Sequence, residues 1–245
     1  MRVWVVPVVL VCIAGVSLSA PGFGQNSTQK NSSSSSSKTR KAPQAPPKSG
    51  LDDGKVSAGV YRNVSVGLTC KIPAGWVLRT VEMNARDNAE ETSDKNPHVS
   101  QNQGDMGHPS SESSSQKNTE DFGRVLLAAF SRPPEAAGAD VNSSIVIAAE
   151  PVAVYPGLKE AVQYVGPLTE VAKAQGFIAD EDPYEVAIGA KTLVQVDFHK
   201  DVGSRVMRQS TLIFLARGYA VSITVIGGTE DEVGDLVDGL TFAGK

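Results

Sequence analysis

Two long stretches of this chain lack the apolar side chains from which a folded core is built. Residues 25–50 include a run of six serines and no large apolar side chain, and residues 84–120 are rich in Ser, Asn, Asp, Glu and Gln without an aromatic residue. Such segments bury too little surface to offset the conformational entropy lost on folding. We therefore expect a disordered tether over 25–50 and one folded domain over 51–245 with a disordered insertion at about 84–120.

The N-terminus has the order of residues typical of an export signal. Arg2 is followed by an apolar stretch over 3–16, and small residues then lead to Gly22 and Gly24. A positive residue, an apolar segment and small residues at positions −3 and −1 define a cleavable signal peptide. We expect a signal peptide over 1–24 and export to the periplasm or the medium, with an uncleaved membrane anchor as the alternative.

Charge is divided unevenly along the chain. Residues 25–50 carry five Lys and Arg side chains and no acid, whereas all 27 acidic residues lie from Leu51 onward. An acidic body repels phosphates, which argues against a nucleic acid as its partner. The basic segment is interpreted as a soluble linker, with weak contact to an anionic membrane surface as the alternative.

One cysteine remains once the leader is removed. Cys12 lies within the apolar leader, so Cys70 has no partner for an intrachain disulfide. Alternate residues around Cys70 are apolar, which predicts one buried face of a strand and a buried thiol rather than a reactive one. The residues expected on that face are Val64, Val66, Leu68, Cys70 and Ile72.

The rest of the pattern predicts strands joined by short turns. Apolar runs and alternation favour strands at 61–72 (bent at Gly67), 124–130, 144–152, 184–188, 191–200, 205–216 and 219–226. The pairs Gly189-Ala190 and Arg217-Gly218 are typical of two-residue hairpin turns. Both faces of 219–226 carry apolar or small residues, so we expect this strand at the centre of the sheet.

Two helices are expected. Apolar spacing predicts a helix over 157–175, kinked or split at Gly166-Pro167 and stopped by Gly176. The sequence Thr229–Glu232 is a capping box that begins a second helix, whose expected apolar face is Val233, Leu236, Val237 and Leu240. The predicted fold class is α+β, a mostly antiparallel β-sheet flanked by helices.

Two segments resemble a known superfamily. The stretch YRNVSVGLTCKIPAGWVLRT (61–80) and the stretch RGYAVSITVIGGTEDEVGDLVDGLTF (217–242) are similar to the PsbP/Mog-like superfamily, which includes PsbP and the bacterial DcrB-like envelope proteins. This resemblance implies an α/β/α sandwich around a central antiparallel sheet. It carries over no functional residue, and the insertion at 84–120 departs from the family pattern.

A candidate ligand patch lies at the end of one predicted hairpin. Asp197 and His199 project to the same face of a strand by alternation, and a short loop would place Arg205 across from His199. Asp197 would then fix the tautomer of His199. Arg208 sits in an apolar row, where it either extends to solvent or binds an anion. The alternative for these residues is an exposed salt network of little energetic value.

No recognised catalytic, metal-binding or cofactor-binding motif occurs in the sequence. The leading hypothesis is therefore an exported envelope module that binds a protein or another envelope component without catalysis. The second hypothesis is a carrier of a small ligand or lipid in a cleft between helix 157–175 and the sheet. The third is an enzyme with a site at Asp197, His199 and Arg205.

Overall fold

A computed structural model describes residues 50–85, 123–138 and 140–243. The expected signal peptide (1–24), nearly all of the expected tether (25–50) and nearly all of the expected insertion (84–120) lie outside the described residues. Among the described helices, none has both the length and the apolar character needed to cross a membrane.

Most of the described chain forms one eight-stranded sheet in which every pairing is antiparallel. Its order is β4-β5-β6-β11-β10-β9-β7, with β8 paired to β9, so β11 lies between β6 and β10 as predicted. This confirms the predicted α+β class. The strands are β4 (Val77–Leu78), β5 (Arg124–Phe130), β6 (Ser144–Pro151), β7 (Ile178–Ala179), β8 (Tyr184–Ile188), β9 (Lys191–Val202), β10 (Arg205–Ala216) and β11 (Tyr219–Gly227).

A second, four-stranded sheet was not predicted. It has the order β1-β2-β3-β12, from β1 (Lys55–Ser57), β2 (Val60–Asn63), β3 (Leu68–Lys71) and β12 (Leu240–Phe242). Leu240, expected on the last helix, instead pairs with Cys70. Val64, expected on the buried strand face, is 87% exposed because residues 64–67 form the turn between β2 and β3, where Gly67 has φ +71°.

The helices begin and end close to the predicted signals. Helix α2 (Ala161–Ala174) continues through Pro167 and is not split there. Because proline has no backbone N–H, the helix lacks the hydrogen bond that this residue would otherwise donate to the Gln163 carbonyl. Gly176 (φ +86°) ends it, as predicted. In α3 (Glu230–Asp238) one half of the predicted capping box is confirmed, because the Glu232 N–H donates to Thr229 Oγ1 at 3.1 Å, whereas the Glu232 carboxylate accepts from the Gly228 N–H and not from Thr229. A 3₁₀ turn spans Val152–Val154, and residues 80–85 are also helical.

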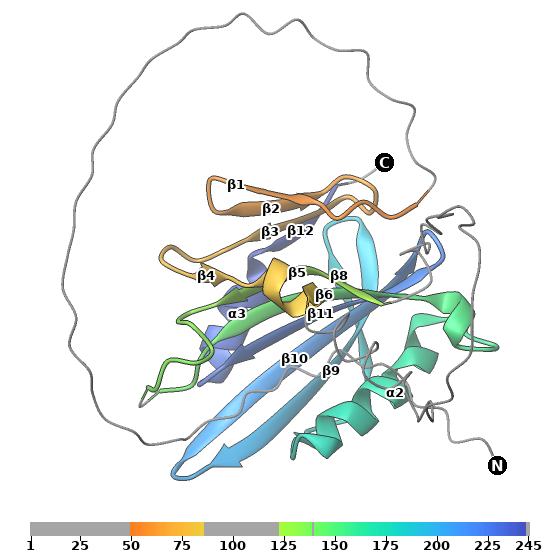
Figure 1. Cartoon of the computed structure of the whole chain (residues 1–245). Helices are drawn as coiled ribbons and strands as arrows, with labels where there is room; N and C mark the ends of the chain where they lie inside the picture. Colours follow the sequence, from red (N-terminus) through yellow and green to blue (C-terminus); the bar gives the residue numbers. More distant parts are fainter. Residues whose placement is uncertain (1–49, 86–122, 139, 244–245) are drawn as a thin grey trace, which may run out of the picture.

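The two faces of the eight-stranded sheet pack against different layers (Figure 1). The small sheet and α3 cover one face, called here the α3 face, and α2 covers part of the other, called the α2 face. Cys70 lies fully buried between the two sheets, and burial raises the pKa of its thiol to about 12. The prediction of a buried thiol is therefore confirmed.

Candidate functional site

The α2 face carries a row of polar side chains across three neighbouring strands. Register aligns Thr211 of β10 with Thr224 of β11, and Ser222 follows two positions along β11. Gln209 extends the row at one end and Glu150 of β6 at the other, and the row spans roughly 20 Å at the rise of a strand. Thr224 is half-buried, and the other four residues are at most 9% exposed. In order along the row, the five residues are Gln209, Thr211, Thr224, Ser222 and Glu150.

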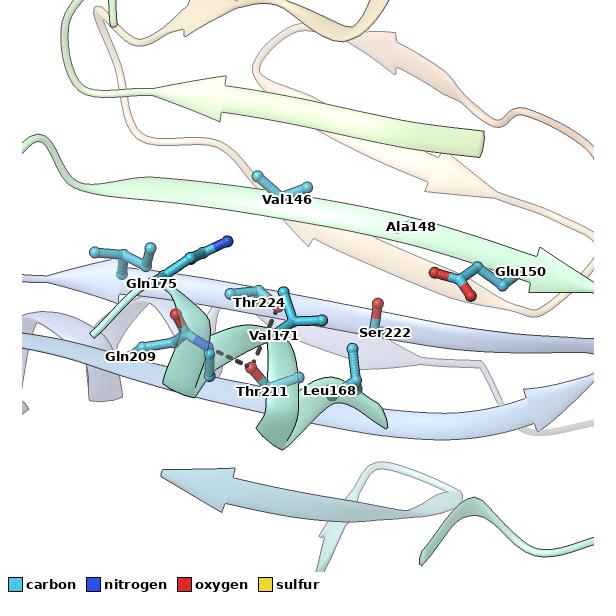
Figure 2. A pocket seen from close by; sticks show the side chains of 12 residues that line it. Val146, Ala148, Glu150, Leu168, Val171, Gln175, Gln209, Thr211, Ser222 and Thr224 are labelled. Atoms are coloured by element: carbon cyan, nitrogen blue, oxygen red, sulfur yellow. Dashed lines mark hydrogen bonds between the residues drawn. The ribbon is translucent and has the colours of Figure 1, made fainter. Parts of the chain in front are cut away.

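These polar groups form the floor of a cavity of about 70 Å³ beneath α2 (Figure 2). Helix α2 contributes three apolar side chains to its wall, Gln175 follows at the end of the helix, and Val146, Ala148 and Ile226 complete the lining from the sheet. The apolar side chains from α2 are Leu168, Val171 and Ala172. A polar floor and a largely apolar helical wall therefore enclose the same space.

The hydrogen bonds of the floor leave some capacity unused. Gln209 Nε2 donates to Thr211 Oγ1 at 3.2 Å, and the hydroxyls of Thr211 and Thr224 lie 3.2 Å apart (Figure 2). Among the described residues, no hydrogen bond uses the Ser222 hydroxyl, which lines the cavity. A hydroxyl both donates and accepts, so Ser222 can serve a bound molecule in either sense.

Glu150 closes one end of the cavity and is held by aromatic hydroxyls. It is 6% exposed, and the Tyr155 hydroxyl donates to its carboxylate. Burial raises the pKa of Glu150, although the hydroxyls of Tyr155 and Tyr164 oppose that shift. Gly123 lies against it, since a Cβ at that position would come within 3.0 Å of Glu150 Cγ.

This arrangement is suited to holding a molecule by hydrogen bonds. The cavity lining contains hydroxyls, amides and one carboxyl, but no histidine, cysteine or lysine that would act as a base or a nucleophile beside them. Burying polar groups under a helix costs free energy unless they find partners. Sequence reasoning missed this row because residues such as Ser222 and Thr224 were interpreted only as small.

The residues predicted as a ligand patch do not all gather in one place, and three of the four lie on the α3 face of the sheet. Arg208, and not Arg205, is in register with His199. The loop between β9 and β10 has only two residues, so Arg205 pairs with Val202 and projects to the opposite face from Arg208. The predicted position of Arg205 is therefore wrong.

The predicted contact between Asp197 and His199 is also replaced by others. His199 Nδ1 contacts the Asp180 carboxylate, beside β7, so Asp180 takes the orienting role expected of Asp197. Asp197 accepts a hydrogen bond from the Tyr184 hydroxyl at 2.6 Å. Arg208 Nη1 lies 3.0 Å from a Glu230 carboxylate oxygen. Asp197 and Arg208 line a cleft of about 570 Å³ beside α3.

Within the described part of the chain, no three side chains from His, Cys, Asp and Glu are grouped so that they could hold a metal ion. Cys70 lies between the two sheets and away from both cavities.

Among the solved structures that show partial likeness to this chain are two bacterial proteins. A Pseudomonas aeruginosa protein of unknown function, PA94, is 17% identical over 45% of this chain and 78% of its own, with a TM-score of 0.32. LpqN of Mycobacterium tuberculosis, described as involved in cell envelope biogenesis, is 13% identical over 51% of this chain and 80% of its own, with a TM-score of 0.29.

No family model and no curated protein matches the chain. At TM-scores this low, neither structural likeness says anything about the function of this chain. The resemblance to the PsbP/Mog-like superfamily therefore stays a prediction.

Proposed function

We propose that this protein is a non-catalytic binding protein that holds a small polar ligand between α2 and the eight-stranded sheet. The observation that carries the proposal is the row of five polar side chains on a sheet face covered by a helix. A helix-covered sheet face is ordinarily apolar, because unpaired buried polar groups cost about 1–3 kcal/mol each. A ligand that satisfies these groups removes that cost.

The cavity favours a compact or narrow ligand with hydroxyl or amide groups. Its volume of about 70 Å³ is well below the roughly 300–1,000 Å³ typical of sites for drug-sized molecules. It therefore fits a small molecule, or one polar end of a larger molecule. A lipid chain is disfavoured, because it would bury the Ser222 hydroxyl without a hydrogen-bond partner.

Export is part of the proposal and is supported by the residue order of 1–24. We propose that the ligand is held in the bacterial envelope or outside the cell. N-terminal sequencing of the protein recovered from its source, together with cell fractionation, tests this part. A mature chain that begins at Gln25 supports it, and an intact leader in a cytosolic fraction contradicts it.

Mass spectrometry of the native protein tests the ligand directly. We expect a bound small molecule, or saturable binding and a raised melting temperature with a panel of polyols, amides and sugars. The variant Ala148→Leu fills the cavity from its floor and should abolish binding while the protein stays folded. Ala187→Leu, at an exposed position of β8, is the matched control and should bind normally.

Equal binding by the Ala148→Leu variant and the wild-type protein would contradict the proposal. So would a protein of unliganded mass that shows no thermal shift with any member of the panel.

A further inference from the structure

The carboxyl of Glu150 lies at one end of the cavity under α2. Glu150 is 6% exposed and lines the cavity, and its carboxylate is directed toward the Ser222 hydroxyl (Figure 2). The hydroxyl of Tyr155 donates to this carboxylate, and Tyr164 of α2 is close enough to affect its pKa. A buried acid therefore faces the space that a ligand occupies.

No positive charge compensates this buried acid within the described part of the chain. Glu150 makes no ion pair there. The titratable groups that affect its pKa are the hydroxyls of Tyr155 and Tyr164, and neither is a cation. From the neighbouring strands, Gly123 lies against it just before β5, and Ala220 of β11 is opposite it in register. Acidic side chains are almost never fully buried unless they are paired, so a positive group is expected from outside the chain.

The arginine on the adjacent strand β5 is directed elsewhere. Arg124 is opposite Ala149, the neighbour of Glu150, so its side chain projects to the α3 face. There its Nε lies 3.3 Å from an Asp53 carboxylate oxygen, and its guanidinium lies 5.7 Å from the centre of the Tyr219 ring. Arg124 is therefore not the counter-charge of Glu150.

The hydroxyl of Ser222 lies beside the Glu150 carboxylate and lacks a partner. Ser222 is 7% exposed and lines the same cavity, and no hydrogen bond among the described residues uses its hydroxyl. Ser222 is opposite Ala148 in register, and Glu150 is opposite Ala220. Glu150 and Ser222 are therefore diagonal neighbours on adjacent strands, with Cα atoms roughly 7–8 Å apart. One small molecule can contact both groups.

We propose that the ligand under α2 is an amino alcohol, whose ammonium binds Glu150 and whose neighbouring hydroxyl binds Ser222. This assignment depends on the ligand site proposed above and specifies the chemistry of its occupant. The ammonium brings three donors and the missing positive charge, and charge-assisted hydrogen bonds are the stronger kind. The hydroxyl gives Ser222 the partner that the protein does not provide.

Calorimetric titration of the full chain with serinol and glycerol tests the amine. The two molecules differ only at the central carbon, which carries an amine in serinol and a hydroxyl in glycerol. Serinol should bind at least about tenfold more tightly. Glu150→Gln should remove this preference, and its amide oxygen can still accept from Tyr155, so the end of the cavity keeps its shape. Glu185→Gln, at an exposed position of β8, is the matched control and should keep the preference.

Proton release gives a second readout that needs no variant. Burial raises the pKa of Glu150, and an ammonium bound beside the carboxylate lowers it again. Serinol should therefore release protons when it binds near the folded pKa of Glu150, and its affinity should rise as the pH increases through that pKa. Glycerol should release none. Calorimetry in two buffers with different ionisation enthalpies measures the difference.

Equal affinity for serinol and glycerol overturns the amino alcohol, and so does a preference for serinol that survives in Glu150→Gln. Binding of serinol without proton release at any pH in this range also overturns it. In each of these cases the ligand site itself stands, because a molecule is still held under α2. Absence of saturable binding by serinol, by glycerol and by every polyol, amide and sugar of the panel overturns both the amino alcohol and the site.

Discussion

The two faces of the eight-stranded sheet use alternate residues of the same strands for different purposes. On the α3 face, Leu212, Phe214 and Ile223 are at most 2% exposed and pack into the largest apolar cluster. On the α2 face, the intervening Thr211 and Ser222 are also buried but are polar. The first face stabilises the fold through apolar burial. The second also buries an apolar cluster against α2, but it gives up part of that stability where hydrogen-bonding groups surround the cavity.

This difference separates residues that hold the fold from residues that serve a ligand. A sheet needs one well-packed face, and the α3 face supplies it through its contact with the small sheet. The α2 face is then free to carry polar residues, provided that water or a ligand satisfies them. Substitutions on the two faces should accordingly have opposite consequences for stability and binding.

The largest expected effect concerns Cys70 at the packed interface. Burial raises the pKa of its thiol from 9.0 to about 12, which lowers the thiolate fraction about a thousandfold. We expect Ellman's reagent to modify Cys70 in the folded protein about a thousandfold or more slowly than in the unfolded chain near pH 8. A thiol that reacts at the rate of the unfolded chain would contradict the tight packing of this face.

Truncation of Phe214 should cause the next largest effect. Its ring packs edge-on against Phe242 at 5.3 Å between centroids, and Lys191 Nζ lies 4.2 Å from its centroid. Phe214→Ala should lower the free energy of unfolding by about 3–5 kcal/mol in denaturant titrations. Val202→Ala, at a position 46% exposed, should change it by less than about 1 kcal/mol. Similar losses in the two variants would remove the distinction between core and surface.

Replacement of Glu150 should change how stability depends on pH. Its pKa is raised in the folded state, so the folded protein holds this proton more tightly than the unfolded chain. The contribution of Glu150 is therefore fully present below its unfolded pKa and is lost as the pH rises through its folded pKa. In the Glu150→Gln variant, the free energy of unfolding should no longer show this loss as the pH rises. Denaturant titrations from acidic to neutral pH measure the difference. An unchanged pH profile would mean that the carboxyl is solvated and that the end of the cavity is open.

The double variant Thr211→Val/Thr224→Val should show the smallest change in stability. The two hydroxyls lie 3.2 Å apart, and replacement of both by methyl groups removes their contact together with the acceptor that Thr211 Oγ1 offers to Gln209 Nε2. We expect the free energy of unfolding to fall by about 1–2 kcal/mol, while binding at the cavity is lost. A loss of several kcal/mol would show that this row stabilises the fold, which would remove the contrast between the two faces.

The local parts of the fold could be predicted from the sequence. Glycines fixed the two hairpins, and both Gly189 and Gly218 have the positive φ that their turns require. Thr229 indicated the start of α3, because its hydroxyl accepts a hydrogen bond from the N–H of Glu232, three residues further along the chain. The small sheet was missed because β12 has only three residues and pairs with a strand far away in the chain, and no local pattern encodes that pairing.

The candidate site could not be predicted for a related reason. Its polar residues come from three strands, and only the register of those strands brings Thr211, Thr224 and Glu150 onto one face. The patch around Asp197 and His199 lies within one hairpin, so the sequence predicted part of it. The prediction placed Arg205 opposite His199, whereas the residue opposite His199 is Arg208. An odd shift in register exchanges the face on which a side chain lies.

The most direct test is an NMR titration of the chain with small polyols and amides, with the amides of Ser222 and Thr224 and the methyls of Val171 as reporters. The predicted result is saturable shifts confined to residues that line the cavity under α2, and their loss in the Ala148→Leu variant. Shifts that are absent for every compound, or that persist unchanged when the cavity is filled, would contradict the claim that the polar row under α2 is a ligand site.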